Sequence, residues 1–594
     1  IPEVVSVAAE APLLDQRRVA TGETLSAEDL EAIPSSRSMW DTIRQTPGVL
    51  IDRVNIGGAE NAQQSTVAGP GTVMQQNAWS IDGVLVSEPN TSGSSAVFFD
   101  LEAVEEVQIT TGGSDIALAT GGVSTNLVTR RGTHQWRGSG RILRSNGSWQ
   151  SDFGFDANDL ARGGPWNLGN AQATTAQTNR IDVVQEVGFE LGGPLIGDRL
   201  WLWMGWSDQT VDVFTLGDFG EDSSIEIPTI KLNADLTSST SLMAFYMDSD
   251  RFNDGRNVGP LFPPPTSWRF GSKADVLKLQ LYQQVGSQMY FDVALSQVDE
   301  RLTAEAKGGR DVNAVLGPDG VWQNSFISGG SELPQESVRF DGRYFLDGGA
   351  AQHELRFGAS YRQAEIDSSS AWPGEGGVIG VATTIPVIGL PLGTATVGGN
   401  SRADRQIGSI WFQDTISRGD LTFSLGLRYD TQDGSNLASR QEPNELLPDL
   451  LPGRDFAGAD TPFDWSLLAP RLGVTWAFGE RRNNLLRASY ARSGYELSLA
   501  DVLHSNPTKE QSATFLWFDN GDLIFDPSEI GPVVALDTVS TNRTDTAFDT
   551  PVVDELLLGV ERMFGPHQAA GATLRLRQTD DAIQENRIVF DAGM

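Results

Sequence analysis

The sequence has no cysteine and only four histidines among its 594 residues. Without cysteine the chain forms neither a disulfide framework nor a thiolate metal site. The histidines stand far apart in the sequence, and none has the spacing of a metal-binding motif. The short motifs of zinc proteases, serine hydrolases and P-loop NTPases are also absent. The sequence therefore predicts a protein that is not an enzyme and needs no cofactor.

Basic residues are scarce too. The chain has 43 lysines and arginines against 78 aspartates and glutamates, which gives a formal net charge of -35. Because binding to nucleic acid needs clustered lysine and arginine, we expect no such partner. Two acidic loops, residues 310–320 and 519–529, contain the oxygen ligands that Ca²⁺ prefers. They lack the order of an EF-hand, so solvated loops are the favoured interpretation over a Ca²⁺ site.

Long hydrophobic runs are missing as well. The longest is LWLWMGW at residues 200–206, whereas a transmembrane helix needs about 20 apolar residues. Transmembrane helices are therefore excluded. Transmembrane β-strands are not excluded, because their apolar and polar residues alternate and produce no long run.

Alternating segments dominate the chain from Trp136 onward, and we count about fifteen of them. In one, Leu421 and Phe423 face one side while Thr422 and Ser424 face the other. The polar faces are rich in Gly, Ser, Thr and Arg, which suits the wet interior of a large barrel. By this alternation the barrel lumen is expected to receive three arginines: Arg356, Arg362 and Arg428.

The connections between these segments differ in length. Residues 235–240 and 283–288 are tight, whereas residues 367–400 and 429–464 are long and rich in Gly and Pro. Short turns on one rim and long loops on the other are typical of outer-membrane barrels. A soluble β-sandwich or propeller is the alternative, and the pattern favours the membrane barrel.

The first 135 or so residues have a different character. A helix is predicted to start at Ser38, which can cap it, and to end at Pro47 and Gly48. Strands are predicted over residues 79–86 and 104–111. Two glycine pairs, Gly112-Gly113 and Gly121-Gly122, then stand within eleven residues between two alternating runs. Glycine is unfavourable in regular structure, so these pairs indicate a sharp turn or close packing.

Three motifs in this region resemble the plug of TonB-dependent outer-membrane transporters, and the rest of the chain looks like their barrel. The motifs are WDTIRQTPGV at residues 40–49, SIDGVLV at 80–86 and GGVSTNLVTRRGT at 121–133. Residues 186–206 and 469–476 are similar to the subclass that follows a carboxypeptidase-regulatory-like domain. The motif positions implied by the resemblance are Pro47, Gly48, Asp82, Gly83, Gly112, Gly113, Gly121, Gly122 and Arg130.

The resemblance implies a membrane all-β fold, a large antiparallel barrel with an α+β plug in its lumen. The expected division is a periplasmic segment at residues 1–16, a plug at 17–134 and a barrel at 135–594. The family's barrels have 22 strands, and about fifteen fit into this sequence. The C-terminal residues 589–594 also lack the family's terminal aromatic residue. We therefore expect the closing strands to be absent from these 594 residues.

The resemblance also implies a function in the bacterial outer membrane: import of a scarce or bulky ligand, driven by the inner-membrane proton-motive force. The implied partners are outer-membrane lipid, the TonB complex, the barrel assembly machinery and an unknown extracellular ligand. In one departure from the family, Ala68 stands where Ile-Arg-Gly has its arginine. A non-transporting scaffold or adhesin remains the alternative, and a secreted soluble hydrolase is a weaker one. The TonB-box candidate consists of Val4, Val5, Ser6, Val7 and Ala8.

Overall fold

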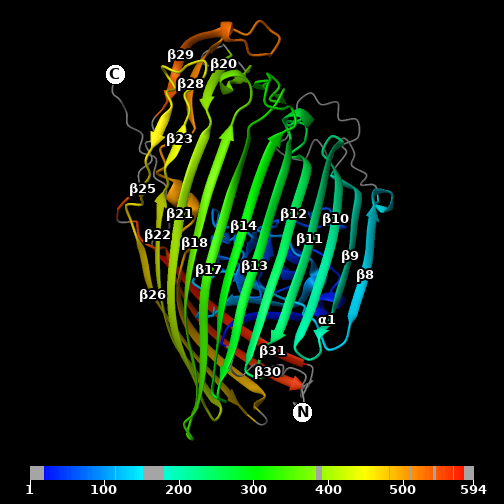
Figure 1. Cartoon of the computed structure of the whole chain (residues 1–594), viewed down its shortest axis with the longest axis vertical. Coiled ribbons are helices and arrows are strands. Elements are labelled where there is room, and N and C mark those ends of the chain that lie inside the picture. Colours follow the sequence, from blue (N-terminus) through cyan, green and yellow to red (C-terminus); the bar gives the residue numbers. More distant parts are fainter. Residues whose placement is uncertain are drawn as a thin grey trace.

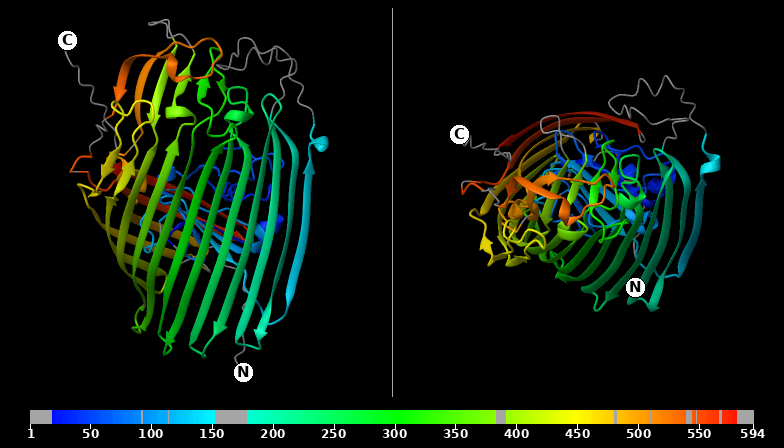
Figure 2. Two further views of the ribbon diagram at one scale, coloured as in Figure 1. Left: turned by 45° about the horizontal axis from the view of Figure 1, so that its top comes forward. Right: turned by 90° about the horizontal axis from the view of Figure 1, so that it is seen from above.

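The structure is a computed structural model that describes residues 19–91, 93–113, 115–151, 179–382, 391–479, 482–508, 510–538, 544–546, 548–565 and 568–580. A tall curved sheet of antiparallel strands forms most of the molecule (Figure 1). A smaller N-terminal unit, called the plug below and coloured blue, lies on the concave side of this sheet (Figure 2). The chain thus forms a wall around a separate folded unit.

The plug contains a five-stranded sheet in the order β1-β6-β7-β4-β5. β4 and β7 are parallel, and the other neighbours are antiparallel. Trp40 and Trp79 lie in its core, 6.0 Å apart between ring centroids. The elements of the plug are β1 (Thr21–Ser26), α1 (Ala27–Ala32), α2 (Met39–Ile43), β2 (Leu50–Ile51), β3 (Val67–Ala68), η1 (Met74–Gln76), β4 (Ala78–Ile81), β5 (Val84–Leu85), η2 (Leu101–Ala103), β6 (Val104–Gly112) and β7 (Ser124–Thr129).

Local predictions for the plug had mixed outcomes. The strand predicted over residues 104–111 is confirmed as β6. The predicted helix begins after Ser38 as α2, but the Ser38 side chain makes no capping hydrogen bond within the described residues. Its carbonyl instead accepts a hydrogen bond from the Thr42 amide at 3.1 Å. The single strand predicted over residues 79–86 was wrong. Asp82 and Gly83, with φ of 47° and 78°, form the two-residue turn of a β4–β5 hairpin.

Within the described residues fifteen strands form the continuous row of the large sheet, which confirms the number of about fifteen predicted from the alternation. From one edge to the other they are β8 (Arg137–Asn146), β9 (Arg180–Ile196), β10 (Leu200–Thr215), β11 (Phe219–Asp235), β12 (Thr240–Arg256), β13 (Trp268–Val285), β14 (Met289–Ala306), β17 (Ser328–Asp347), β18 (Gln352–Ala371), β21 (Gly399–Arg418), β22 (Leu421–Asn436), β26 (Trp465–Phe478), β27 (Asn484–Gly494), β30 (Val552–Gly565) and β31 (Gln568–Asp580). The short β25 (Ala459–Asp460) pairs beside β22.

The row has two free edges. Within the described residues no ladder joins β8 to β31, so the sheet is open there. The resemblance predicted a closed barrel of 22 strands, and closure is not seen in this part of the chain.

The two faces of the large sheet differ as the alternation predicts. On β22 the side chains of Leu421, Phe423 and Leu425 are 37–47% exposed on the convex face, while Thr422 and Arg428 are buried. Many strands have 16–20 residues, about twice the 9–11 that cross a bilayer. The apolar belt therefore covers only part of the strand length.

The two rims of the sheet also differ. Tight turns, for example at residues 236–239 and 286–288, lie at one rim, and the long connections lie at the other. Three of the long connections join in a six-stranded sheet, called the loop sheet below, in the order β16-β15-β19-β20-β28-β29 (top of Figure 1). Its strands are β15 (Ala314–Leu316), β16 (Trp322–Gln323), β19 (Ile379–Val381), β20 (Leu392–Val397), β28 (Gln511–Trp517) and β29 (Ile530–Asp537).

The remaining elements are short. Two more strands of the long connections, β23 (Ser439–Gln441) and β24 (Arg454–Phe456), form a small ladder. The other helices are η3 (Gly147–Trp149), η4 (Pro264–Thr266), η5 (Glu375–Gly377), α4 (Leu499–Leu503) and η7 (Pro527–Glu529). Among the residues described, no helix has the length and apolar character needed to span a membrane.

The orientation of β22 can be tested with a matched pair of substitutions. Phe423→Arg places a charge on the apolar convex face, so it should destabilise the membrane-inserted protein by about 2–4 kcal/mol near the bilayer midplane. Ser424→Arg is the control, because Ser424 lines a cavity on the concave side. Denaturant titration in phospholipid vesicles measures both. An equal loss of stability in the two variants would contradict the assignment of the faces.

Candidate functional site

One side of the plug packs against the wall through apolar side chains. Its hydrophobic core continues without a break into inward-facing residues of β9 to β14, including Val184, Ile225 and Phe245. The contact is close at Gly57 and Gly58. A Cβ added at these positions would lie 2.8 Å from Ile181 and 2.9 Å from Val184, respectively. Apolar burial therefore fixes the plug on this side.

The opposite side of the plug meets arginines instead. Arg356 on β18 binds the Asp115 carboxylate at 2.7 Å and the Asp341 carboxylate at 2.9 Å. Arg428 on β22 donates to the Ile116 carbonyl at 3.2 Å. Arg471 on β26 donates to the carbonyls of Asp115 and Leu118. The plug segment that follows the first glycine pair is thus held by side chains from three wall strands.

The last two strands continue this arginine contact. Arg575 on β31 donates to the Thr21 hydroxyl at 2.9 Å and the Pro70 carbonyl at 3.3 Å. Arg577 donates to the Gly121 carbonyl at 2.7 Å. Glu555 on β30 accepts from the Gly113 amide at 2.8 Å and pairs with Arg577. Many of these bonds end on plug backbone carbonyls, so they depend on plug shape more than on plug sequence.

Ala68, where the family motif has an arginine, lies close to this contact. Ala68 lies in β3, just before the loop whose Pro70 carbonyl receives Arg575. The wall supplies the guanidinium groups, and the plug supplies the acceptors. We call Arg356, Arg428, Arg471, Arg575 and Arg577 the arginine wall.

The two glycine pairs lie at this side of the plug. A Cβ on Gly112 would lie 2.6 Å from Arg575, and one on Gly121 would meet Ser493 of β27. A Cβ on Gly122 would overlap the backbone of Gln76 within the plug. Gly113 has a φ of 63°, which favours glycine. The glycines thus allow close approach to the wall, together with one sharp turn.

A second set of ion pairs joins the plug to β8 and β9. Arg141 of β8 binds Asp100 at 2.6 Å and Glu186 at 2.6 Å. Arg130, at the end of the plug, binds Glu190 at 2.7 Å. Arg37 of the plug binds Glu186 at 3.1 Å. The family motif singled out Arg130 as a site residue, but the sequence did not predict that it would bind Glu190.

Towards the tight-turn rim, a cavity of about 2070 Å³ separates the plug from the wall. The Asp82-Gly83 turn projects into it. Lys231 of β11 binds the Asp82 carboxylate at 3.0 Å, and Lys278 of β13 donates to the Asp82 carbonyl. Asp82 also accepts from the Thr129 amide and hydroxyl. One motif residue therefore ties the hairpin, the last plug strand and two wall strands together.

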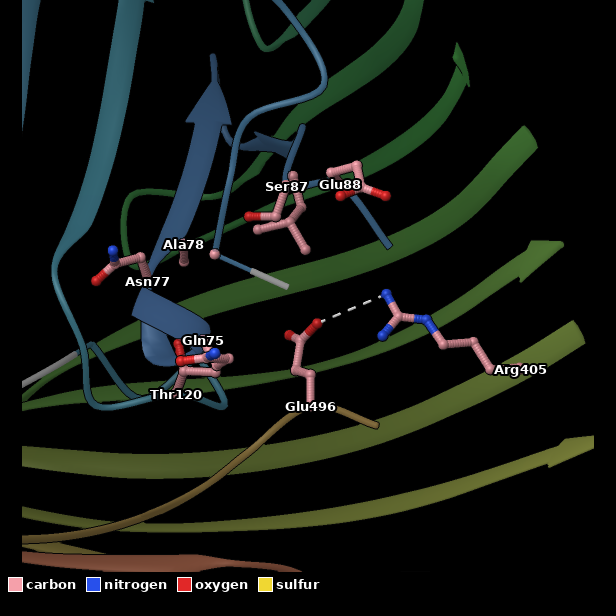
Figure 3. A pocket seen from close by; sticks show the side chains of 10 residues that line it. Gln75, Asn77, Ala78, Ser87, Glu88, Thr120, Arg405 and Glu496 are labelled. Atoms are coloured by element: carbon pink, nitrogen blue, oxygen red, sulfur yellow. Dashed lines mark ion pairs between the residues drawn. The ribbon is translucent and has the colours of Figure 1, made fainter. Parts of the chain in front are cut away.

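Towards the other rim, the connection from β27 to β30 descends onto the plug. The amide of Leu499, at the start of α4, donates to the Pro89 carbonyl at 3.0 Å. Glu496 binds Arg362 at 2.6 Å. Its carboxylate also lies 3.9 Å from Arg405, as the dashed line in Figure 3 marks. Burial raises the pKa of the Glu496 carboxyl, but the two arginines outweigh it and lower the pKa below its ordinary value.

A small cavity of about 10 Å³ remains beneath this connection, which is space for about one water molecule. Figure 3 shows Ser87 and Glu88 of the plug on one side of it and Arg405 and Glu496 on the other. Direct passage between plug and wall is closed at this point.

The predicted site residues fall into three groups. Arg356 and Arg428 point to the plug, and Arg362 points to the connection above it. The motif residues lie in the plug or at its boundary with the wall. The TonB-box candidate lies outside the described residues. Within the described part of the chain, no three His, Asp or Glu side chains are grouped to hold a metal ion, and this includes both acidic loops.

A plug seated inside a tall β-sheet with an apolar outer belt defines a plugged outer-membrane barrel. The family description "TonB dependent receptor-like, beta-barrel" matches residues 227–528, and "TonB-dependent Receptor Plug Domain" matches residues 16–124. The chain belongs to the TonB-dependent receptor family. This family is located in the outer membrane and is not enzymatic.

Individual relatives are distant. The TonB-dependent transporter Oar of Myxococcus xanthus is 24% identical over 280 residues, which cover 42% of this chain and 22% of Oar. The chain thus spans about a fifth of that relative. The outer membrane transporter YddB from Escherichia coli has a TM-score of 0.64 and 14% identity, covering 92% of this chain and 67% of YddB. The siderophore receptor PirA from Acinetobacter baumannii has a TM-score of 0.62 and 13% identity, covering 96% of this chain and 72% of PirA. These structures show the shared fold.

The close packing at the second glycine pair predicts that alanine substitutions at Gly122 and Gly121 differ in their cost to stability. Gly122→Ala should destabilise the plug by about 1–3 kcal/mol, because its Cβ would overlap the rigid Gln76 carbonyl. Gly121→Ala is the control, since its nearest neighbour is the Ser493 side chain, which can rotate away. Urea titration followed by tryptophan fluorescence measures both. Equal midpoints for Gly122→Ala and the parent would contradict the packing.

The ion pair between Asp115 and Arg356 predicts acid sensitivity. Desolvation raises the pKa of Asp115, but Arg356, the Ala117 amide and Arg339 together outweigh it, so the pKa is well below its ordinary value. A carboxyl with a lowered pKa stabilises the seated plug above about pH 4, and this contribution is lost as the pH falls further. Protease cleavage of the plug should therefore increase between about pH 4 and about pH 3. Asp115→Asn should be cleaved faster at neutral pH and show a smaller pH effect.

Proposed function

We propose that this chain forms the plug and much of the barrel wall of a TonB-dependent transporter, which imports a scarce or bulky ligand. The proton-motive force of the inner membrane would supply the energy through TonB. The observation that carries the proposal is the asymmetry of the plug's seat. Apolar packing, reinforced by ion pairs to β9 and β11, holds one side, while hydrogen bonds and ion pairs predominate on the other.

This asymmetry indicates where a path can open. Separating apolar surfaces costs about 25 cal/mol for each Å² exposed, because apolar groups form no hydrogen bonds with water that would offset this cost. Polar groups exchange their partners for water, so each typical hydrogen bond contributes only about 0.5–1.5 kcal/mol net. The plug therefore separates more easily from the arginine wall than from β9 to β14. We place the ligand path along the arginine wall.

Ligand entry would begin at the rim with the long connections. Residues 57–76 and 87–97 of the plug are the candidate ligand-facing segments. The second is covered by the connection that carries Glu496 and α4, through the Leu499 and Ala500 amides on Pro89 and Asn90. A ligand that displaces this connection would break its contacts with the plug and with Arg362. Binding above would thereby loosen the plug below.

Force would enter from the tight-turn rim. We propose that Val4, Val5, Ser6, Val7 and Ala8 add a strand to periplasmic TonB. The first described residue, Val19, packs on Gly473 in the second half of β26, towards the tight-turn rim. It leads into β1, which pairs only with β6 among the described strands. Pulling ahead of β1 would peel an edge strand and reach the first glycine pair at the end of β6.

The domain division that fits this function is a periplasmic segment at residues 1–16, a plug at 17–134 and a barrel from 135 onward. The apolar convex belt would contact outer-membrane lipid, and insertion would require the barrel assembly machinery. The alternative is a scaffold or adhesin that shares this architecture but does not transport. Capture of the full-length protein by the periplasmic domain of TonB separates the two, since a non-transporting scaffold has no need to bind it.

Two engineered disulfides test where the path opens. Gly121→Cys with Ser493→Cys ties the plug to β27, because a Cβ added at Gly121 would lie 3.4 Å from the Cβ of Ser493. This is close to disulfide geometry, and the natural chain has no competing cysteine. The transported compound is first identified as the one that a deletion strain fails to import in a screen of siderophores, glycans and peptides. Oxidation of the double variant should abolish uptake of this compound. Reductant should restore it.

The control disulfide ties the apolar side. Gly58→Cys with Val184→Cys brings the Cβ atoms to 3.7 Å. Because Gly58 has a φ of 92°, this variant is used only if its reduced form transports normally. Uptake should survive its oxidation. Loss of uptake with the control tie but not with the first would place the path on the opposite side.

A further inference from the structure

One buried arginine of the wall has no polar partner. Arg251, on the concave face of β12, is 3% exposed, and its Nε and Nη2 make no hydrogen bond within the described residues. The other buried arginines there are Arg405, Arg428, Arg471 and Arg487, and each makes a hydrogen bond or an ion pair. Arg251 is therefore exceptional among the buried cations that the structure describes.

The surroundings of Arg251 are aromatic and cationic. Its guanidinium carbon lies 5.6 Å from the ring centroid of Phe98 in the plug and 5.5 Å from that of Phe270 in β13. Arg256 also lies over the Phe270 ring, at 4.7 Å. Arg256 and Arg53 of the plug both act on Arg251 as like charges. Arg251 and Arg256 thus meet at the Phe270 ring, and Arg53 of the plug adds a third positive charge that acts on Arg251.

The nearby anion does not bind this group directly. Glu221 on β11 attracts both Arg251 and Arg256, but within the described residues it forms an ion pair with neither, and its Oε1 accepts from the Asn253 side-chain amide at 2.7 Å. A buried guanidinium without a paired anion is unfavourable. In a chain with 78 acidic and 43 basic residues, a carboxylate partner would be easy to place here. An unfavourable charge that persists in such a chain points to a function in binding.

The position of the group fits a ligand that arrives from the rim of long connections. Two residues before Arg251, the Ser249 hydroxyl accepts from the Phe98 amide at 3.0 Å, which seats the plug against β12. Arg256 is the last residue of β12 and only partly buried. Arg53 has a 36% exposed side chain, binds Glu60 at 3.2 Å and precedes the candidate ligand-facing segment at residues 57–76. Two partly exposed arginines, one of them paired with Glu60, therefore accompany the buried one.

We propose that Arg251, Arg256 and Arg53 form an oxyanion-binding site at the junction of plug and wall, which takes a carboxylate or phosphate group of the transported ligand. Guanidinium groups bind such oxyanions through paired N–H donors, so the unsatisfied Nε and Nη2 of Arg251 match this chemistry. The proposal rests on the transport function above and adds to it the chemical class of the ligand. An anion at Arg251 would also lie next to Phe98 of the plug, so its binding would alter a contact between the plug and the wall.

The test is a thermal-shift titration of the full-length protein in detergent. Inorganic phosphate and succinate are titrated separately at constant ionic strength, and the midpoint of plug unfolding is followed by tryptophan fluorescence. Ligand that binds only the folded state raises this midpoint. We expect the parent to be stabilised by at least one of the two anions, and the comparison of the two identifies phosphate or carboxylate as the preferred group.

Arg251→Met keeps the length and the aromatic contacts but removes the charge. It should raise the midpoint in the absence of added anion, because the unpaired charge is gone, and it should abolish the rise caused by phosphate or succinate. Arg269→Gln is the matched control on the neighbouring strand, where Arg269 is on the convex face with a 53% exposed side chain. It should respond to the anions as the parent does. If Arg251 had only a structural role, Arg251→Met should instead lower the midpoint in the absence of added anion.

Two outcomes would overturn the proposal: no midpoint shift of the parent with either anion, or the same shift in parent and Arg251→Met. Both are independent of the transport function, which capture by TonB and the disulfide ties test without an anion. If TonB capture fails while the anion response depends on Arg251, the site stands and its place in transport is wrong.

Discussion

The hydrogen bonds from wall arginines to plug backbone carbonyls are the interaction on which the rest of this structure depends. They let a barrel wall hold a separately folded unit without fixing it permanently in place. Arg471 reaches the Leu118 carbonyl between the two glycine pairs, and Arg577 reaches the Gly121 carbonyl in the second pair. If the plug withdraws, as the proposed transport requires, a carbonyl remains a good acceptor for water, whereas opening the contact with β9 to β14 would expose apolar surface. In that proposal the same wall anchors the plug on one side and releases it on the other.

The glycines follow from the same constraint. The wall approaches Gly112 so closely that a side chain has no room there, because a Cβ at Gly112 would lie 2.6 Å from the Arg575 guanidinium. Glycine is otherwise unfavourable in a strand, so its presence at the end of β6 reflects the wall rather than the plug itself. Plug sequence and wall sequence are thus matched at these positions.

Alternation along the strands was enough to predict the wall, because a period of two puts Phe423 and Thr422 on opposite faces whatever their partners. It was also enough to direct Arg356, Arg362 and Arg428 inward. What the three arginines bind was not predictable, since Asp115, Glu496 and the Ile116 carbonyl are distant in sequence. The β4–β5 hairpin was read as one strand because its two-residue turn interrupts the apolar pattern so briefly. The isolated charge of Arg251 has no sequence signal at all, because any inward arginine looks the same until its neighbours are placed.

The loop sheet joins three connections that are far apart in the sequence. β15 pairs in parallel with β19, and β20 pairs with β28, so each connection completes the hydrogen bonding of another. Phe515 and Trp517 of one connection and Val315 of another share its core. The rim of long connections is thus a folded unit rather than a set of independent loops. A binding partner at this rim would contact a surface assembled from three segments, and a substitution in the shared core of one segment would disturb the other two.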